Sequence, residues 1–451
     1  MPPLNFVYIT THDTGRYTQP HGHAVDTPNL MAFARDSTLF RNNHCCGPTC
    51  SPSRAAMLTG QHVHTSGMIG LAHQGFSLAN PERHLAHFLA RNGYDTALFG
   101  HQHEAATPAE IGYARAYMAE SPPWWNNLKR DPAYWDHENA RAAAAFLGEK
   151  HDKPFYMALG MYHTHREFCD PADPDINPDY ITLPPQIPDT AENRRDFAGF
   201  LTSARRADEC AGIVLDALKR NGLLDNTVVF FTTDHGIAYP WTKCNLYDAG
   251  TGTTLMLHFP GNSSRGRALD SLTSHLDIFP TLCELLGLEK PDWLQGVSLL
   301  PALNRERAEV REKLFTQVIY HASYEPQLAV RTHRYKYIRR FDASHPFTAL
   351  PNIDHSPIFH RLMELGLPER QIAEEQLYDL FFDPMERNNL AHDPRHTATR
   401  DEMRGLLEQW MRETEHPLLN GPVPLPKGAS YTRPTCPSPG GLTPEDRVTA
   451  E

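Results

Sequence analysis

Four short apolar segments, separated by stretches with helical periodicity, constrain the fold of this chain more than any other feature of its sequence. Each holds four to seven residues, many of them β-branched or aromatic, as expected for strands that are buried on both faces of a parallel sheet. They cover residues 4–10, 96–99, 155–161 and 227–233. Between them, amphipathic segments open at Thr27-Pro28 and Asn80-Pro81, and a long one covers residues 191–220. Strands that alternate with helices predict an α/β fold, with a doubly wound, mostly parallel sheet flanked by helices.

Each of the four predicted strands ends in a cluster of polar residues. The clusters are Thr11-His12-Asp13, residues 100–103 with His101 and His103, residues 162–165 with His163 and His165, and Asp234-His235-Gly236. The carboxyl ends of parallel strands meet at one edge of the sheet, where ligands bind. Imidazole serves both metal binding and proton transfer near neutral pH. We therefore expect the four clusters to converge in one functional site.

The pattern changes after about residue 311 to short strand-like pieces, at residues 328–332 and 335–338, followed by a helix at about 399–412. We expect a catalytic domain over residues 1–312 and a smaller α+β domain over residues 313–451. From about residue 417 the chain contains eight prolines, which indicates an extended tail or an arm wrapped on the body. Such an arm is compatible with clasping a second subunit or with lying along its own chain, so an oligomer is left open.

The segment HCCGPTCSPSRAAMLTG, at residues 44–60, carries the most specific chemistry. Ser51 is suited to cap a helix, Pro52 to occupy its first turn, and Gly60 to end it. Cys50 would then lie at a helix N-terminus, where free N–H groups favour anions, with Arg54 about one turn further on. On this spacing alone, a buried structural cysteine and a nucleophilic thiolate of lowered pKa are both compatible with the pattern.

This segment resembles the sulfatase signature C-x-P-S-R-x-x-x-L-T-G, and the order of the other clusters is also similar to that of sulfatases, a family of the alkaline phosphatase superfamily. Within the family, GIAYPWTKCNLYDAGT at residues 236–251 and SGMIGLAHQ at residues 66–74 resemble the N-sulfoglucosamine sulfohydrolase (sulfamidase) branch. The resemblance implies an alkaline phosphatase-like fold. It also implies hydrolysis of a sulfate ester or sulfamate, on a sulfated sugar such as N-sulfoglucosamine or a glycosaminoglycan fragment, with release of inorganic sulfate.

The same resemblance implies a role for each candidate catalytic residue. Cys50 would be converted by a formylglycine-generating enzyme into formylglycine, whose hydrated aldehyde attacks the sulfuryl group and later expels sulfate. Arg54 would fix the formylglycine, and His103 would hydrogen-bond it. His165 and Lys243 would bind the sulfuryl oxygens, and one of them would protonate the leaving group. Sulfuryl transfer needs both cations around the developing charge and an acid for the departing atom.

The resemblance also implies that the metal ion of the family would be bound by His12, Asp13, Cys50, Asp234 and His235. Sulfatases usually have Asp-Asp at the first pair and Asp-Asn at the second, an all-oxygen set suited to calcium. Two imidazoles shift the preference toward manganese or zinc. The expected cofactor is therefore one divalent metal, calcium by family, with His12 either ligating it or turned away.

A second departure is His101, which stands where the family has the lysine of its G-K-x-H pattern. The charge of a histidine follows its protonation, so we expect activity to fall as pH rises. His62, His64 and His73 follow the signature helix, and either line the substrate pocket or lie in a solvated loop.

Composition excludes several other classes of protein. Lys plus Arg minus Asp plus Glu is 42 − 54 = −12, so we expect no nucleic-acid partner and no anionic membrane surface as a partner. No apolar run approaches the length of a membrane helix, and the N-terminal residues do not resemble a signal peptide. The eight cysteines have no regular spacing, which favours a reducing compartment. We therefore expect a cytoplasmic protein.

Three other functions compete with the sulfatase interpretation. The first is a phosphonate or phosphate ester hydrolase of the same superfamily, and the charge of the pocket should separate the two because a phosphate monoester carries about two negative charges near neutral pH. The second is a non-catalytic protein that binds sulfated ligands. The third is a cysteine hydrolase that uses unmodified Cys50.

Overall fold

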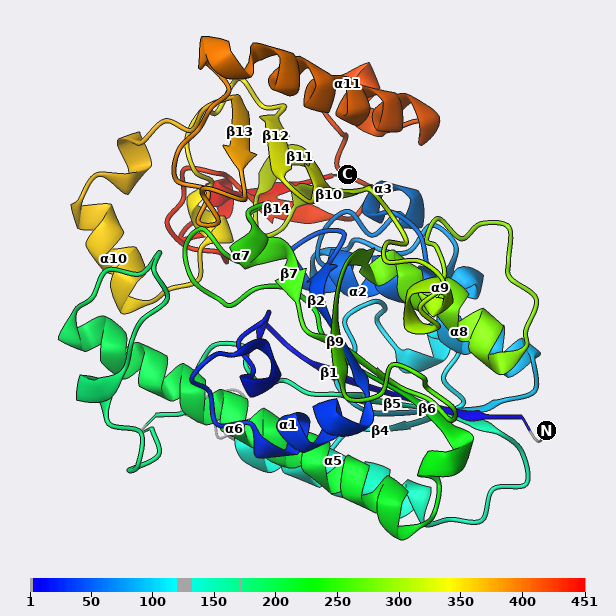
Figure 1. Cartoon of the computed structure of the whole chain (residues 1–451). Coiled ribbons are helices and arrows are strands. Elements are labelled where there is room, and N and C mark those ends of the chain that lie inside the picture. Colours follow the sequence, from blue (N-terminus) through cyan, green and yellow to red (C-terminus); the bar gives the residue numbers. More distant parts are fainter. Residues whose placement is uncertain (1–2, 120–131, 171, 451) are drawn as a thin grey trace.

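A large mixed sheet lies at the centre of the computed structural model, which describes residues 3–119, 132–170 and 172–450 (Figure 1). Nine strands of the described chain form it, in the order β4-β3-β5-β1-β6-β8-β2-β7, with β9 paired to β2. Pairing is parallel from β4 through β6 and between β2 and β9, and antiparallel at β7 and β8. The strands are β1 (Asn5–Thr11), β2 (Thr38–His44), β3 (Asp95–Gly100), β4 (Arg115–Tyr117), β5 (Phe155–Gly160), β6 (Thr227–Thr233), β7 (Gly252–Thr253), β8 (Leu255–His258) and β9 (Arg267–Ser274).

The predicted α/β fold is confirmed, and the four predicted strands are β1, β3, β5 and β6, with bounds that differ by at most one residue at either end. The sequence pattern did not indicate β2, β4 or β7 to β9. Strand β2 has the sequence TLFRNNH and pairs with neighbouring strands on both sides. The second half of this sequence is polar, so it lacks the apolar pattern that is typical of a buried strand. The central four strands are apolar because both of their faces are covered.

Helices cover both faces of this sheet (Figure 1). Successive strand residues point to opposite faces, so Val7 and Ile9 pack with α1, α5 and α6, while Phe6 and Tyr8 pack with α2, α4 and α8. The segment at Asn80 begins with a 3₁₀ turn, and the helix itself starts at Leu85. The helices are α1 (Pro28–Asp36), α2 (Cys50–Thr59), α3 (Val63–Ser66), α4 (Leu85–Arg91), α5 (Pro132–Leu147), α6 (Ala191–Arg220), α7 (Asp248–Thr251), α8 (Ile278–Leu286), α9 (Leu300–Leu303), α10 (Pro357–Glu364) and α11 (Thr397–Glu413).

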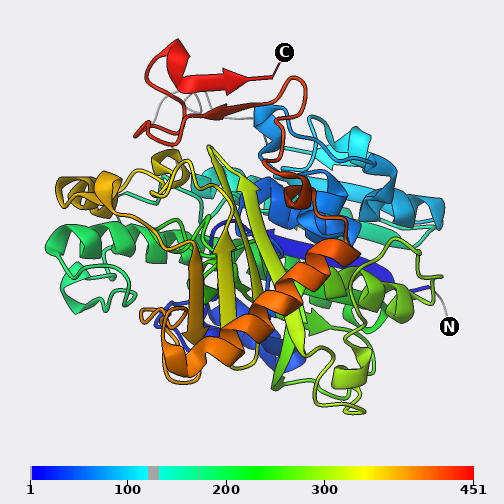
Figure 2. The ribbon, with the colours of Figure 1, turned by 90° about the horizontal axis from the view of Figure 1, so that it is seen from above.

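The C-terminal region contains a second sheet, which is antiparallel and has the order β10-β11-β12-β13. Helix α11 crosses one face of it (Figure 2), where Trp410 stacks on Phe315 with ring centroids 4.8 Å apart. The apolar cluster that contains α2 and α8 continues into this sheet, so the two regions share buried contacts. The strands are β10 (Lys313–Tyr320), β11 (Tyr324–Thr332), β12 (Tyr335–Arg340) and β13 (Glu375–Asp379).

The proline-rich segment packs on its own chain. Its strands β14 (Ser430–Thr432) and β15 (Arg447–Thr449) pair with each other. The Thr432 N–H donates to the Ala322 carbonyl oxygen at 2.7 Å, and the Leu350 N–H donates to the Pro434 carbonyl oxygen at 3.0 Å. Among the described residues, no helix combines the length and the apolar character needed to cross a membrane.

Close backbone packing at the end of β5 gives a first prediction. A Cβ atom at Gly160 would lie 1.8 Å from the His101 carbonyl oxygen, so alanine would force apart the ends of β3 and β5. Overpacking of this kind costs about 1–3 kcal/mol of unfolding free energy. We expect Gly160→Ala to lower the midpoint of urea unfolding accordingly. As a matched control, Gly405 lies exposed within α11 with open space around it, and Gly405→Ala should stabilise the protein by up to about 1 kcal/mol. Equal midpoints for the two variants would contradict the prediction.

Candidate functional site

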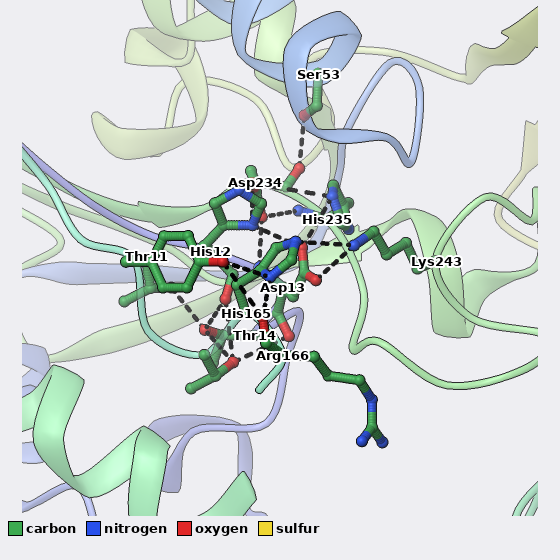
Figure 3. A network of polar contacts seen from close by, with 12 residues as sticks. Thr11, His12, Asp13, Thr14, Ser53, His165, Arg166, Asp234, His235 and Lys243 are labelled. Carbon is green, nitrogen blue, oxygen red and sulfur yellow. Dashed lines mark hydrogen bonds and ion pairs between the residues drawn. The ribbon is translucent and has the colours of Figure 1, made fainter. Parts of the chain in front are cut away.

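The polar clusters that follow β1, β5 and β6 lie together at one edge of the central sheet (Figure 3). Strand β1 lies between β5 and β6, so His12 and Asp13, which directly follow β1, occupy the centre of the site. Figure 3 shows His12, Asp13, Asp234 and His235 directed toward one another, whereas the guanidinium of Arg166 points away. The convergence expected from the strand ends is therefore present.

Helix α2 brings Cys50 to this edge of the sheet. The structure corrects the expected cap, because Thr49 is the N-cap residue and Cys50 itself is the first residue of the helix. Gly60 ends the helix with a φ of 67°, as the sequence predicts. Ser53 Oγ donates to the Asp234 carbonyl oxygen at 2.6 Å, which ties α2 to the end of β6.

Arg54 is almost completely buried beneath the site. Its Nε donates to Asp234 Oδ2 at 3.2 Å, and its Nη2 donates to the Thr11 carbonyl oxygen at 3.3 Å. A buried guanidinium is tolerated only when it is paired and hydrogen-bonded. Arg54 therefore holds together the ends of β1 and β6 and places a permanent positive charge within one helical turn of Cys50.

Four of the five predicted metal ligands, His12, Asp13, Cys50 and His235, offer ligand atoms that all lie within 4.8 Å of one another. His12 Nδ1 lies 2.7 Å from Asp13 Oδ1, and His235 Nε2 lies 3.2 Å from the same oxygen. His235 Nε2 is buried and makes no hydrogen bond, as expected for a nitrogen that serves as a ligand. His12 is directed into the cluster rather than away from it.

The fifth predicted ligand, Asp234, lies at the margin of this cluster. Its Oδ2 is 3.3 Å from His12 Nδ1, and its Oδ1 accepts the backbone N–H of Asp13 at 2.8 Å. Burial raises the pKa of Asp234, but His235, His12 and Arg54 outweigh burial and hold that pKa below its usual range. Asp13 behaves in the same way, since Lys243 and His235 outweigh the effect of its burial. Both carboxylates are therefore charged.

A second group of imidazoles adjoins the first. Ligand atoms of His12, His101 and His103 lie within 4.8 Å of one another, and His103 Nε2 lies 3.0 Å from His73 Nδ1. Burial, with smaller contributions from Arg54 and His165, lowers the pKa of His101 to about 3. His101 is therefore neutral near neutral pH, which corrects the expectation that its changing charge would lower activity as pH rises.

Lys243 lies between two carboxylates. Its Nζ is 2.8 Å from Asp13 Oδ2, 3.3 Å from Asp354 Oδ2 and 3.5 Å from His165 Nε2. Burial lowers the pKa of Lys243, but Asp13 and Asp354 outweigh burial and hold it well above its usual range. Lys243 is therefore a fixed cation, and the geometry brings it together with His165 as the sequence predicts.

Asp354 is a site residue that the sequence pattern did not indicate. It lies in the loop before α10, in the C-terminal region, and its side chain is 22% exposed. Its sequence context, NIDHSP, reads as a loop that caps a helix, and Ser356 does cap α10. Because Asp354 is far from Lys243 in sequence, nothing in the local pattern could have indicated the contact.

The three histidines after the signature helix have different environments. His73 contacts His103 and so belongs to the site. His62 and His64 instead pack against Trp410 of α11, where His62 Nε2 accepts the indole N–H at 3.2 Å. His62 and His64 therefore neither line the substrate pocket nor lie in a solvated loop, because they are packed between the central region and the C-terminal region.

The buried thiol of Cys50 is not activated in this arrangement. Burial raises the pKa of Cys50 well above its usual range, and Lys243 lowers it only in part. The unmodified side chain is therefore a neutral thiol near neutral pH, whereas the thiolate is the nucleophilic form of cysteine. This argues against a cysteine hydrolase and leaves the sulfatase, the phosphonate or phosphate ester hydrolase and the binding interpretations.

Comparison with known proteins gives concordant similarities. Residues 4–288 match the family model described as Sulfatase, and residues 235–358 match the model described as N-sulphoglucosamine sulphohydrolase, C-terminal. The chain is 29% identical over 475 residues to the N-sulphoglucosamine sulphohydrolase of Homo sapiens, covering 93% of this chain and 92% of that protein. It is 27% identical over 468 residues to an ulvan-active sulfatase of Formosa agariphila, covering 90% and 74% respectively. The crystal structure of the phosphonate monoester hydrolase of Agrobacterium radiobacter superposes with a TM-score of 0.72 at 20% identity, covering 99% of this chain and 100% of that one.

Proposed function

Because this chain belongs to the sulfatase family and is a hydrolase of sulfate esters or sulfamates, we propose that it cleaves the sulfate group of a sulfated sugar by means of a formylglycine made from Cys50. The observation that carries the proposal is the position of Cys50, which begins α2 within the cluster of His12, Asp13 and His235. Lys243 supplies a cation for the anionic sulfuryl group, and Arg54 supplies one beside residue 50.

One divalent metal fits the donor set of this site. His12, Asp13, His235 and residue 50 would hold it, with Asp234 beside them, and the buried Nε2 of His235 without a hydrogen bond supports that assignment. The metal would supply Lewis-acid polarisation of a bound oxygen. Calcium is the metal of the family, while the two imidazoles favour manganese or zinc. Elemental analysis of the purified protein would identify which of calcium, manganese and zinc is bound.

Residue 50 requires oxidation before it can act. The buried thiol is neutral, so an oxygen nucleophile from the hydrated aldehyde of formylglycine fits this site better than a thiolate. A formylglycine-generating enzyme is the partner that this maturation needs. The hydrated aldehyde supplies the oxygen that attacks sulfur.

The surrounding side chains bind the sulfuryl group and move a proton. Lys243 is a permanent cation that would bind the sulfuryl oxygens and stabilise the charge that develops on them, while Arg54 would fix the formylglycine and stabilise its charge. His165 Nε2, 3.5 Å from Lys243 Nζ, faces the same space and is the candidate acid for the departing oxygen or nitrogen. His101 and His103 lie next to His12 as neutral rings, because burial lowers the pKa of both, and His103 would hydrogen-bond the formylglycine.

The substrate class is a sulfated sugar, supported by the N-sulphoglucosamine sulphohydrolase and the ulvan-active sulfatase to which the chain is similar. Sulfamate and sulfate ester both remain within the proposal. The acidic Asp354 beside Lys243 reduces the positive charge of the pocket, which favours a singly charged sulfate over a phosphate monoester. The phosphonate monoester hydrolase shares the fold, and at 20% identity that similarity concerns the fold alone.

Mass spectrometry of the peptide that contains Cys50 tests this proposal, on protein made together with a formylglycine-generating enzyme. We expect the aldehyde at residue 50, and sulfate release from N-sulfated or O-sulfated sugars in preference to phosphonates. A free thiol at residue 50 under these conditions, or a preference for phosphonates, would overturn the proposal.

Asp354 gives a second prediction. Its carboxylate lies beside the cation that receives the sulfuryl group, so it opposes the binding of anions. We expect Asp354→Asn to tighten inhibition by inorganic sulfate about fivefold, which corresponds to about 1 kcal/mol for a partly exposed charge at this distance. The neighbouring exposed residue offers a control, and His355→Gln should leave the inhibition constant unchanged. Weaker or unaltered inhibition in Asp354→Asn would show that the carboxylate does not act on the anion.

A further inference from the structure

A surface cavity of about 870 Å³ lies outside the candidate site, and its volume is typical of pockets that bind small molecules. Its walls come from four parts of the chain, within residues 16–23, 185–188, 241–252 and 370–387. The first three belong to the central region, and the fourth belongs to the C-terminal region. None of the candidate catalytic residues or metal ligands, all of which are described, lines this cavity. The cavity is therefore distinct from the candidate site and lies where the two regions meet.

Three arginines give the cavity a positive lining: Arg16, Arg370 and Arg387. Arg16 Nη2 donates to the Asn43 carbonyl oxygen at 3.1 Å, and Arg387 Nη2 donates to the Pro185 carbonyl oxygen at 2.9 Å, so both contact uncharged groups. None of the three arginines forms an ion pair with another residue of the described chain. Their planar guanidinium groups therefore keep the capacity to bind a carboxylate or a sulfate.

The acidic residues of the described lining, Asp248 and Glu386, are already paired with other cations. An Asp248 oxygen lies 2.9 Å from Arg331 Nη2, and a Glu386 oxygen lies 3.0 Å from Lys336 Nζ. These four charges cancel, so the three arginines without ion pairs leave the cavity positive. In a protein with a net charge of −12, such a concentration of positive charge indicates an anionic ligand.

Aromatic rings form much of the remaining wall, from Tyr17, Trp241, Tyr247 and Tyr378. The Arg370 guanidinium lies 5.8 Å from the centre of the Trp241 ring. Trp241 has a φ of 62°, a left-handed backbone conformation that bulky residues rarely adopt, and strained residues of this kind cluster at ligand-binding sites. A pyranose ring has an apolar C–H face that packs on aromatic rings, so arginines and aromatic rings together suit an acidic sugar.

The cavity continues toward the candidate site. Trp241 lies two residues before Lys243 in the segment that follows β6. An adjoining cavity of about 180 Å³ shares Trp241 and Arg370 with the larger one, and its lining includes Ile353, the residue before Asp354. Asp354 in turn contacts Lys243. A ligand in the larger cavity therefore lies beside the candidate site rather than at a remote surface.

We propose that this cavity binds a further acidic sugar residue of an oligosaccharide substrate, separate from the sulfated sugar that reacts at residue 50. The inference deepens the proposed function and rests on it in taking the substrate to be a sugar. Arg16, Arg370 and Arg387 bind the carboxylate or sulfate of this further residue, and the aromatic rings pack on its sugar ring. Both anions offer oxygens that accept paired hydrogen bonds from a guanidinium.

Isothermal titration calorimetry on the full chain tests this inference with three tetrasaccharides. Hyaluronan tetrasaccharide carries carboxylates and no sulfate, neocarratetraose sulfate carries sulfates and no carboxylate, and cellotetraose carries neither. We expect at least one of the two acidic tetrasaccharides to bind at least about tenfold more tightly than cellotetraose, because charge-assisted hydrogen bonds are the strong ones. Binding of hyaluronan tetrasaccharide alone assigns the cavity to a carboxylate, and binding of neocarratetraose sulfate alone assigns it to a sulfate.

Variants of the lining locate the bound tetrasaccharide. Arg370→Gln and Arg387→Gln should each weaken its binding by at least about tenfold, and both arginines are exposed, so the fold should survive. Trp241→Gly should also weaken binding, and glycine suits the φ of this position. Arg361→Gln is the matched control, since Arg361 is an exposed arginine of α10 that does not line the cavity, and this variant should bind like the unaltered protein.

Two outcomes would overturn the inference. One is an equal affinity, or no measurable affinity, for all three tetrasaccharides. The other is binding that stays unaltered in Arg370→Gln, Arg387→Gln and Trp241→Gly, which would place the ligand outside this cavity. Because hyaluronan tetrasaccharide has no sulfate to release, its binding is measured independently of catalysis. A protein that binds it in the cavity but keeps a free thiol at residue 50 contradicts only the proposed function, whereas one that releases sulfate without such binding or any effect of the variants contradicts only this inference.

Discussion

Replacement of Cys50 by alanine is expected to lower the rate of sulfate release by at least about 10⁴-fold, because the variant has neither the nucleophile nor its precursor. The fold should survive, since the change removes only one sulfur from the first residue of α2 and alanine favours a helix. Initial rates on a sulfated sugar, together with a urea unfolding curve, measure both effects. The reason is chemical rather than structural, so the loss should appear in kcat.

Cys46→Ala offers a matched control for this experiment. Cys46 is equally buried and lies close in sequence, but its sulfur contacts Ser274 Oγ at 3.5 Å, outside the candidate site. It should keep most of the activity at a small cost in stability. Sulfate release by Cys50→Ala within tenfold of the unaltered protein would exclude residue 50 as the nucleophile.

Lys243→Met is expected to lower kcat by about 10²–10³-fold, the usual effect of removing one preorganised group that stabilises charge in the transition state. It should also destabilise the protein by roughly 3 kcal/mol, because Asp13 and Asp354 lose the cation that they share. The two effects can be separated, since the loss of kcat concerns the sulfuryl group and the loss of stability concerns Asp13 and Asp354.

The double variant Lys243→Met with Asp354→Asn makes this separation. Removing the second carboxylate relieves part of the uncompensated negative charge, so the free energy of unfolding should recover in part relative to Lys243→Met. The kcat should not recover, because no cation faces the sulfuryl group. If kcat returned together with stability, Lys243 would act only by holding the site together.

Local sequence patterns were sufficient to predict the central strands of the sheet and most residues of the candidate site. The strands β1, β3, β5 and β6 were predicted because buried strands have a short apolar pattern that needs no knowledge of distant residues. Cys50 and Arg54 were proposed because the segment that holds them begins a helix and resembles the sulfatase signature. Strand β2 was missed for the opposite reason, since its polar residues are explained only by the neighbours on which they pack.

The sequence by itself determined which residues come to the edge of the sheet, because strand order along the chain and polar residues at strand ends are local properties. Only the tertiary structure decided their charge and their partners. The pKa of His101 is lowered by burial, Lys243 is shared between Asp13 and Asp354, and His163 is placed between Asp136 and Cys169. Each of these depends on desolvation and on distances of a few ångströms between residues from different elements, and neither quantity is encoded in a local pattern.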